Sequence, residues 1–422
     1  MNCESFGSCG SCTLGGSYED QILYKKQLIG DKFREFFDGE FEFFASSPQN
    51  YRIRAEFGIW HDIWHGAFDL AYTMGGARSK KILINECPKV ALPIANLMPR
   101  LLEALRRSEA LKERLFGVEF ISCSSGILAT LLYHKRLGER EQEAICELAD
   151  KLGIRVMARA RGQKLLSGEL SLTDELCVDG RVYKFRFGEN AFIQPNRGVN
   201  EKMIAWARSC VDFGKEGTNE VRAAQNFAVK NSIAENSVAQ NSSHEQSAPR
   251  NSSCEKHAVR PESSAARDLL ELYCGHGNFT IPLAAKFNRV LASEISKSSI
   301  ANARINCKLN GVCNAQFVRL SADELMSAFA RRREFERLKG IDIFSYDFSH
   351  VLIDPPRAGL EPSVIDFIKN FQNLIYISCN PQTLFENLRS LCTTHEVRRF
   401  AIFDQFAHTA HIECGVLLRR RS

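Results

Sequence analysis

The sequence predicts an α/β protein with a doubly wound sheet in its C-terminal part and mixed α+β structure before it. In the C-terminal part, short continuous apolar runs alternate with helical stretches, which is typical of parallel strands covered on both faces. In the N-terminal part, residues 50–60 alternate apolar and charged side chains, as a half-buried strand does. Residues 97–115 and 139–152 have the apolar spacing of amphipathic helices. Further short strands are expected at 68–74, 120–122, 128–133 and 155–158.

Length and composition indicate a soluble protein of more than one domain. A chain of 422 residues is long enough for two or three domains. Hydrophobic residues make up 44% and charged residues 25%, as in soluble globular proteins. We find no apolar run of the roughly 18 residues that a membrane helix needs, and no signal peptide. We therefore expect a cytoplasmic protein with no membrane partner. The net charge of +5 is compatible with an anionic partner but does not require one.

The chain divides into four segments that differ in amino-acid composition and pattern. Residues 215–266 hold nine Ser and six Asn and few large apolar side chains, so they cannot bury enough apolar area to offset chain entropy. We expect a Cys-containing N-terminal segment at 1–30, an α+β domain at 31–212, a disordered insertion at 213–266 and an α/β domain at 267–422.

A glycine-rich turn follows the first predicted strand of the domain at 267–422. Gly275 and Gly277 allow a sharp turn and a close approach to a ligand. Thr280 occupies the position of the third glycine in the dinucleotide-binding motif, and Glu294 ends the next strand, where it can accept hydrogen bonds from a ribose. The loop by itself leaves NAD and S-adenosylmethionine as equal alternatives.

Two later strand ends favour methyl transfer. Asp354 is followed by Pro355, Pro356 and Arg357, which give a stiff, extended backbone that can hold a planar base. The next strand ends in Ser-Cys-Asn-Pro, and a thiol presented at a strand end beside a cofactor site is a candidate nucleophile. We therefore predict that Cys379 is the nucleophile; the alternative is a buried structural cysteine.

A thiol is needed because carbon 5 of uracil is a poor nucleophile. Addition of a thiolate to carbon 6 makes carbon 5 enolate-like, so that it can accept a methyl group. The carbon-5 proton must then leave, which requires a general base. Glu413, just before the last apolar strand, is the best candidate for that base.

These motifs together resemble the RNA uracil-5-methyltransferases. The resemblance is carried by LELYCGHGNF, IDPPRAGL, YISCNP, FDQF and HIECGVLL. Within the family, YRIRAEFGIWHD, LLYHKRL and NAFIQPN are similar to the bacterial tRNA branch. The likeness covers nearly the whole chain except residues 215–266. It implies that residues 267–422 are a catalytic domain with a class I S-adenosylmethionine-dependent fold and a seven-stranded sheet, and that the α+β domain at 31–212 binds RNA.

The resemblance also implies roles for single residues. Cys379 corresponds to the nucleophile and Glu413 to the proton acceptor. The positions that match S-adenosylmethionine ligands are Gln194, Tyr273, Asn278, Glu294 and Asp354. The implied substrate is the T-loop uridine of tRNA, with a similar loop in tmRNA; no protein partner is inferred.

Four cysteines depart from the tRNA branch. Cys3, Cys9 and Cys12, with Cys87 downstream, resemble the iron–sulfur ligand spacing of the ribosomal-RNA branch. Such thiolates can hold a [4Fe–4S] cluster or a zinc ion. The third alternative is free thiols on a frayed terminus.

The nearest alternative function is therefore uracil-5 methylation of ribosomal RNA. The tRNA branch is favoured because the OB-type domain usual in the ribosomal branch is missing from the predicted elements. A cytosine-5 methyltransferase is disfavoured, because Arg357 stands where such RNA enzymes place a second cysteine. A non-catalytic RNA-binding module is disfavoured by the presence of both Cys379 and Glu413.

Overall fold

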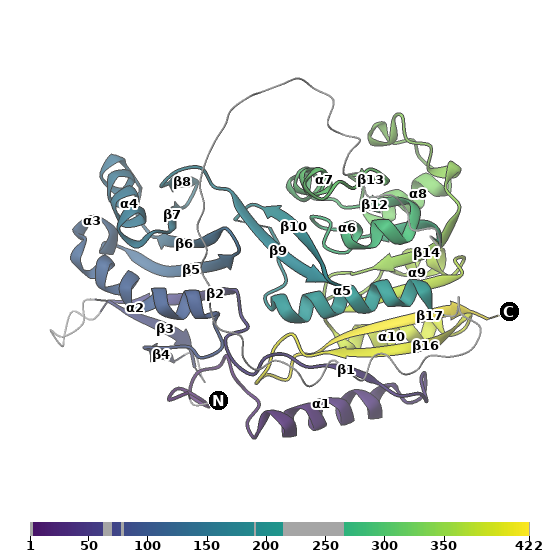
Figure 1. Cartoon of the computed structure of the whole chain (residues 1–422), viewed down its shortest axis with the longest axis horizontal. Coiled ribbons are helices and arrows are strands. Elements are labelled where there is room, and N and C mark those ends of the chain that lie inside the picture. Colours follow the sequence, from purple (N-terminus) through teal and green to yellow (C-terminus); the bar gives the residue numbers. More distant parts are fainter. Residues whose placement is uncertain (1–2, 62–69, 77–79, 190, 214–265, 422) are drawn as a thin grey trace, which may run out of the picture.

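A computed structural model of the chain describes residues 3–61, 70–76, 80–189, 191–213 and 266–421. Within these ranges the chain forms an N-terminal lobe and a C-terminal lobe, with β9, β10 and α5 between them (Figure 1). The predicted insertion at 213–266 lies almost entirely outside the described residues. No helix in the described ranges is both long and apolar enough to cross a bilayer.

The C-terminal lobe is built on a sheet with the strand order β1-β16-β17-β15-β14-β11-β12-β13. All neighbouring strands pair in parallel except for β17, which runs antiparallel to both β15 and β16. The strands are β1 (Glu42–Phe44), β11 (Ala266–Leu272), β12 (Phe287–Ser293), β13 (Ala315–Val318), β14 (Phe348–Ile353), β15 (Asn373–Ser378), β16 (His395–Phe403) and β17 (Glu413–Arg420).

Both faces of this sheet are buried, as the continuous apolar strands predict. Leu269 and Leu270 are neighbours on β11, yet they belong to two different hydrophobic clusters on opposite faces. One face packs against β9, β10 and α5 to α7, and the other against α1 and α8 to α10. The helices are α1 (Tyr18–Phe33), α5 (Arg197–Asp212), α6 (Thr280–Leu283), α7 (Lys297–Asn310), α8 (Ala322–Phe329), α9 (Pro362–Ile368) and α10 (Pro381–Leu391). Short 3-10 turns are η3 (Ala284–Lys286), η4 (Glu336–Leu338) and η5 (Ile343–Ser345).

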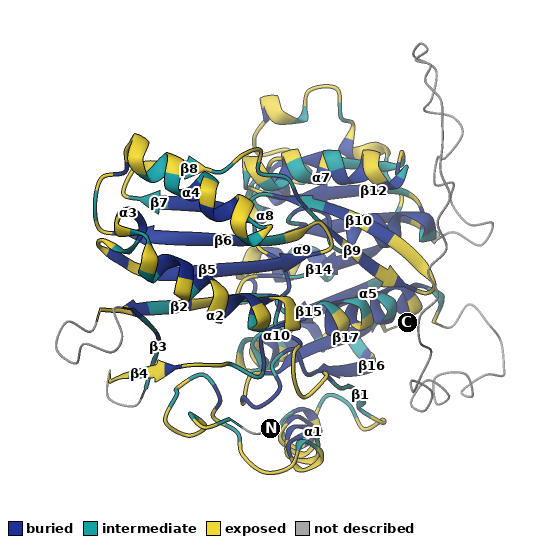
Figure 2. Ribbon diagram, turned by 60° about the vertical axis from the view of Figure 1, so that its left-hand side comes forward, coloured by how far each residue is buried: buried dark blue, intermediate teal, exposed yellow. Residues whose placement is uncertain are grey.

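The N-terminal lobe contains a second sheet with the order β4-β3-β2-β5-β6-β7-β8. One face of this sheet is covered by α2, α3 and α4, and its central strands are buried (Figure 2). The elements are β2 (Arg54–Trp60), β3 (Ala71–Gly75), β4 (Lys81–Ile84), α2 (Leu92–Arg107), α3 (Glu109–Lys112), β5 (Leu115–Cys123), β6 (Gly126–Tyr133), α4 (Glu139–Leu152), β7 (Arg155–Ala160) and β8 (Gln163–Leu166). The antiparallel pair β9 (Leu172–Val178) and β10 (Arg181–Phe187) forms a separate two-stranded sheet.

The structure confirms several predicted elements and corrects one. The predicted helix at 139–152 is α4, and the strand predicted in 50–60 is β2. The helix predicted at 97–115 is wrong at both ends. It begins earlier, at Leu92 beside Pro93, and its C-terminal end is divided by Ser108, whose hydroxyl caps α3. Leu115 then opens β5 instead of closing a helix.

Two segments from outside the predicted catalytic domain complete the C-terminal lobe. The β1 strand adds to the edge of the sheet by parallel pairing with β16, so the sheet has one more described strand than the seven expected. Ile29 and Phe33 of α1 join the core on one face, and Trp206 of α5 joins it on the other. The predicted domain boundaries stay a prediction, but the lobe itself includes these parts of the chain.

Candidate active site

The ends of three adjacent strands bring predicted site residues together. Asp354 follows β14 directly, and Cys379 follows the neighbouring parallel strand β15. Glu413 is the first residue of β17, which pairs antiparallel with β15 so that Ser378 lies opposite Cys414. Cys379 and Glu413 therefore lie at the same end of one strand ladder, at the edge where the carboxyl ends of parallel strands form ligand sites.

The Cys379 thiol is half-buried among two carboxyl groups and a guanidinium group. Burial raises the pKa of the thiol, and the neighbouring Glu413 and Asp354 raise it further, while Arg357 lowers it. The thiolate is the nucleophilic form of cysteine. The surroundings therefore make Cys379 a weak acid whose activation needs a base or a positive charge at the moment of reaction.

The two carboxyl groups are themselves shifted toward neutral pH. Burial and, to a smaller extent, the charge of Asp354 raise the pKa of Glu413 to about 8, while Arg357 opposes the shift. Burial also raises the pKa of Asp354 to about 7. A carboxylate with such a pKa binds a proton much more strongly than an ordinary one, which suits a general base that works near neutral pH.

Hydrogen bonds hold the loops after β14 and β15 against each other. The Asn380 Nδ2 donates to the Arg357 carbonyl over 3.1 Å, while the Asn380 Oδ1 accepts from the Gln382 amide over 3.0 Å and caps α10. Gly359 lies close to this contact, with φ +82°, and a Cβ there would come within 3.0 Å of the Thr383 Cβ. Glycine therefore permits the close approach of the loop after β14 to α10.

The glycine loop after β11 has a backbone conformation unusual for side-chain-bearing residues. Tyr273 has φ +62°, in the left-handed region, and Gly275 and Gly277 have φ +56° and +91°. Glu294 fixes the loop, because its Oε2 accepts from the Gly275 amide over 3.1 Å and its Oε1 from the Ser296 amide over 2.7 Å. Glu294, which we predict to bind the ribose, is thus held directly beside the predicted glycine loop.

Gln194 and Asn278 line one small cavity, together with His276. The Asn278 side chain exchanges two hydrogen bonds of 2.9 Å with the amide of Asn200, a residue of α5. Gln194 is buried, and its Oε1 accepts from the Nε2 of Gln405 over 3.2 Å. The structure therefore brings these two predicted residues together, although 84 positions in the sequence separate them; Tyr273, Glu294 and Asp354 do not line this cavity.

A buried ion pair braces the segment between β16 and β17. The Lys25 Nζ of α1 donates to the Asp404 Oδ1 over 2.7 Å, and both side chains are fully buried. Tyr18 donates to the Asp404 Oδ2 over 2.7 Å, and Lys25 also donates to the Phe406 carbonyl over 3.2 Å. Helix α1 therefore fixes the path of the chain that leads into Glu413.

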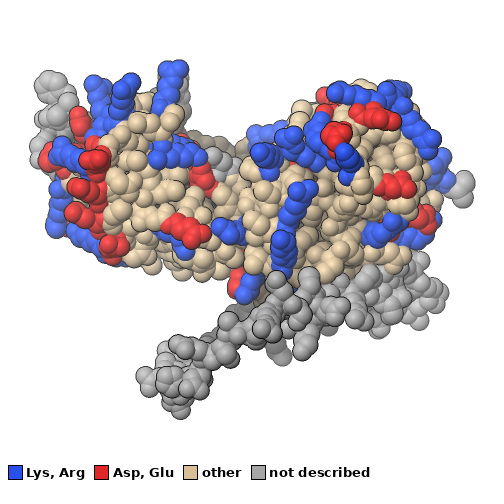
Figure 3. Space-filling view, turned by 90° about the horizontal axis from the view of Figure 1, so that it is seen from above, with Lys and Arg blue, Asp and Glu red and all other residues tan. Residues whose placement is uncertain are grey.

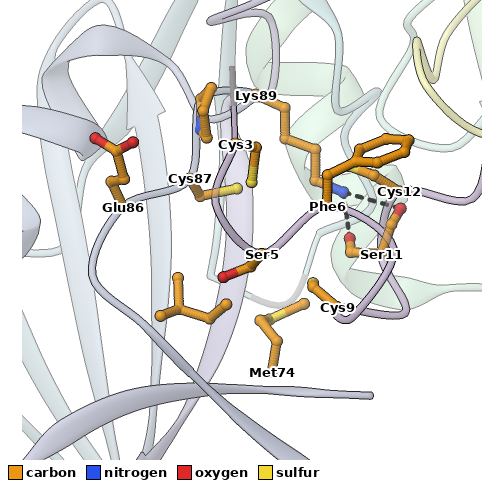
Figure 4. A pocket seen from close by; sticks show the side chains of 12 residues that line it. Cys3, Ser5, Phe6, Cys9, Ser11, Cys12, Met74, Glu86, Cys87 and Lys89 are labelled. Carbon is orange, nitrogen blue, oxygen red and sulfur yellow. Dashed lines mark hydrogen bonds between the residues drawn. The ribbon is translucent and has the colours of Figure 1, made fainter. Parts of the chain in front are cut away.

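The four N-terminal cysteines also converge. Cys3, Cys9, Cys12 and Cys87 line one cavity with largely apolar walls, and Lys89 reaches past it to donate to the carbonyl and hydroxyl oxygens of Ser11 (Figure 4). Burial raises the pKa values of Cys12 and Cys87, and Lys89 opposes both shifts. Within the described ranges, however, no three or more His, Cys, Asp or Glu side chains are grouped closely enough to hold a metal ion. The predicted metal site therefore stays a prediction, without a ligand geometry to support it.

Several residues at the site are not evident from the sequence. Asp404 and Gln405 stand in the FDQF motif, which carries part of the family resemblance but suggests no role. In the sequence, Arg357 is notable only because it stands where an RNA cytosine-5 methyltransferase places a second cysteine. Nothing in the sequence marks Lys25 or Asn200, because their importance comes from contacts with distant parts of the chain.

The strand order and the site together define a class of protein. A parallel sheet with one antiparallel strand next to its end, a glycine loop after the first strand and an acidic end to the second are typical of class I methyltransferases. The solved structure of tRNA (uracil-54, C5)-methyltransferase from Pyrococcus abyssi, in complex with S-adenosyl-L-homocysteine, shares this fold. Its TM-score is 0.62 at 17% identity, over 95% of this chain and 83% of that one.

Comparison of sequences places the chain within this class. The tRNA (Uracil-5-)-methyltransferase family matches residues 17–238 and 224–421. The tRNA/tmRNA (uracil-C(5))-methyltransferase of Campylobacter concisus (strain 13826) is 54% identical over 422 residues, which is 100% of both chains. The enzyme of the same name from Acinetobacter baylyi (strain ATCC 33305 / BD413 / ADP1) is 38% identical over 96% of this chain and 99% of its own. The chain belongs to the tRNA (uracil-5-)-methyltransferase family, as predicted.

Proposed function

We propose that this enzyme methylates carbon 5 of the T-loop uridine of tRNA, and of the similar loop of tmRNA, with S-adenosylmethionine as methyl donor. The observation that carries the proposal is the placement of Cys379 at a strand end beside Glu413, Asp354 and Arg357. The names of the full-length relatives from Campylobacter concisus and Acinetobacter baylyi support tRNA and tmRNA as the substrates. The target base has to leave its stack to reach Cys379, at a cost of a few kcal/mol.

Cys379 starts the reaction as a nucleophile. Its sulfur bonds to carbon 6 of the uracil, and the electrons of the 5,6 double bond move toward carbon 5 and oxygen 4. Arg357, which lies near enough to lower the pKa of the thiol, stabilises the thiolate. S-adenosylmethionine supplies the methyl group that carbon 5 then takes up.

Glu413 ends the reaction as a base. Its carboxylate takes the remaining proton from carbon 5, the 5,6 double bond re-forms, and the bond between Cys379 and carbon 6 breaks. The products are 5-methyluridine, S-adenosylhomocysteine, the free thiolate of Cys379 and a protonated Glu413. Glu413 is buried, which excludes water from the adduct. Its high pKa allows it to accept this proton.

We infer that five residues hold the methyl donor. Glu294 presents its carboxylate to the ribose hydroxyls, and the glycine loop with Tyr273 allows the backbone to approach the ligand. Asn278 and Gln194 are held by amide contacts to Asn200 and Gln405. Asp354 directly follows β14 and lies near Cys379, since its charge raises the pKa of that thiol.

Release of tritium from carbon 5 of labelled uridine tests the proposal. We expect release from unmodified tRNA with S-adenosylmethionine, and none from ribosomal RNA. Release from ribosomal RNA alone would establish the alternative, a ribosomal-RNA methyltransferase. Absence of release from both RNAs would contradict uracil-5 methylation.

The four-cysteine cavity supports a second proposal, a bound metal. The convergence of four thiols beside the Lys89 cation favours an anionic cluster, while the lack of a metal-binding group in the described ranges opposes it. Metal and sulfide analysis of anaerobically purified protein decides between the alternatives. About four iron and four sulfide per chain would establish the [4Fe–4S] cluster. Zinc alone would establish a zinc site, and four reactive thiols without metal would contradict both.

A further inference from the structure

A basic depression lies on the C-terminal lobe, outside the site described above. It has a volume of about 450 Å³ between α7, the end of β13 and η4. Phe317 forms its apolar floor with Ile300 and Ala301, and its polar lining consists of Lys297, Arg304, Arg319 and Arg337. Figure 3 looks onto this side of the molecule, where Lys and Arg side chains gather on the C-terminal lobe with some Asp and Glu side chains among them.

Part of this lining is held in place by the protein. Arg337 donates to the Arg319 carbonyl over 2.6 Å and pairs with Glu324 over 2.5 Å. Within the described part of the chain, no Asp or Glu pairs with Lys297, Arg304 or Arg319. Three positive charges therefore face one depression without a carboxylate to balance them. Their mutual repulsion would be relieved by an anionic ligand.

The depression lies at the same edge of the sheet as the catalytic thiol. Arg319 directly follows β13, and Lys297 starts the helix that follows β12. These strands run parallel to β14 and β15, so their carboxyl ends share one edge with Asp354 and Cys379. A long ligand whose reacting base reaches Cys379 can therefore extend along this edge to the depression.

The chemistry of the lining fits a phosphate backbone rather than a base. The lining contains no Asp, Glu, Asn, Gln, Ser or Thr, and so it lacks side chains that accept hydrogen bonds from base edges. Residues 297–339 hold nine Lys or Arg and four Asp or Glu, an excess equal to the net charge of +5 of the whole chain. Such a concentration of charge favours binding of phosphates without regard to sequence.

We propose that Lys297, Arg304 and Arg319 bind phosphate groups of the RNA substrate at a distance from the methylated uridine. This proposal rests on the proposed function for the identity of the RNA. It assigns these residues to affinity and not to catalysis.

Equilibrium binding of unmodified tRNA to the full-length chain, measured over a range of salt concentrations, tests the proposal. The triple variant Lys297→Ala/Arg304→Ala/Arg319→Ala is compared with Lys26→Ala/Arg389→Ala/Arg421→Ala, which removes the same charge from exposed positions outside the depression and outside residues 31–212 and 297–339. We expect the first variant to bind tRNA about tenfold more weakly at physiological salt. The slope of log K against log salt concentration should fall by about 0.7–0.9 for each phosphate that the variant no longer binds. The control should bind as the parent does.

Two further measurements separate RNA affinity from catalysis and from binding of the methyl donor. The affinity for S-adenosylmethionine and the kcat at saturating tRNA should stay unchanged, because the depression touches neither the methyl donor nor the thiol. An unchanged tRNA affinity and salt slope would overturn the proposal, and so would a loss confined to S-adenosylmethionine binding. Because RNA binding is measured without turnover, failure of the proposed methylation would show in the tritium assay and not here.

Discussion

Cys379 and Cys12 are the same side chain in two different surroundings. Burial raises the pKa of both thiols. Cys12 is surrounded by three further thiols and the Lys89 ammonium group, whereas Cys379 is surrounded by two carboxyl groups and the Arg357 guanidinium. Of the two thiols, only Cys379 has carboxyl groups among the charges that shift its pKa. The proposed nucleophile therefore differs from Cys12 by the proposed base next to it and not by a more acidic thiol.

Substitution of the two thiols gives the largest expected contrast. Cys379→Ala should lower methylation by about 10⁴-fold or more, because no bond to carbon 6 can form, and should leave S-adenosylmethionine binding intact. Cys12→Ala should methylate at close to the parental rate. Initial rates of methyl transfer and calorimetric binding of S-adenosylmethionine provide the measurements. Substantial turnover by Cys379→Ala would rule out the proposed nucleophile.

Loss of the buried ion pair between Lys25 and Asp404 should lower the free energy of unfolding. Lys25→Met leaves the Asp404 carboxylate buried without its cation, which costs about 3–5 kcal/mol of unfolding free energy. The double variant Lys25→Met/Asp404→Leu removes both charges and should recover most of the loss. Denaturant unfolding measures both variants. Equal stability of Lys25→Met and the parent would show that α1 does not hold this segment.

The pH dependence of the rate follows from the shifted pKa values. Glu413 acts as a base only when it is ionised, and its pKa is about 8. The thiolate of Cys379 also becomes more populated as the pH rises. The rate at saturating tRNA should therefore increase from about pH 6 to about pH 8, by up to about tenfold per pH unit for each of the two ionisations that limits it. A rate that is independent of pH in this range would contradict the assignment of the base.

A smaller effect concerns stability at Glu271, which lies near the end of β11. Burial raises the pKa of Glu271 to about 8, and its Oε2 has no hydrogen-bond partner. A folded-state pKa above the unfolded value means that the folded protein binds more protons, so this carboxyl group lowers stability as the pH rises from about 4.5 to about 8. Glu271→Gln cannot ionise and should gain at least about 1 kcal/mol relative to the parent at about pH 8, compared with about pH 5. Thermal unfolding at both pH values measures the difference; equal shifts would contradict the raised pKa.

The catalytic loops could be predicted from the sequence because each consists of polar residues directly after an apolar run. This pattern places Asp354 and Cys379 at the ends of β14 and β15 without knowledge of the tertiary structure. Glu413 was expected just before the last strand and is in fact its first residue, paired in the ladder.

Helix α1 could not be predicted in the same way. Its core-facing stripe contains Gln21, Lys25 and Ile29 at intervals of four, and two of these three side chains are polar. A pattern of apolar residues therefore does not reveal the buried face. Lys25 is buried because Asp404, far away in the sequence, neutralises it. Contacts of this kind also explain why Asn200 was missed, since its role depends on the amide of Asn278.

The most direct test of the central claim is the state in which Glu413→Gln stops. An amide cannot take the carbon-5 proton, whereas formation of the adduct and uptake of the methyl group do not require Glu413. We predict a covalent complex of the Glu413→Gln enzyme with methylated RNA, seen as a slow band on a denaturing gel that carries label from the methyl donor. Cys379→Ala/Glu413→Gln should show no such band. Free turnover by Glu413→Gln, or failure before any adduct forms, would contradict the assignment of Glu413 as the base that releases the product.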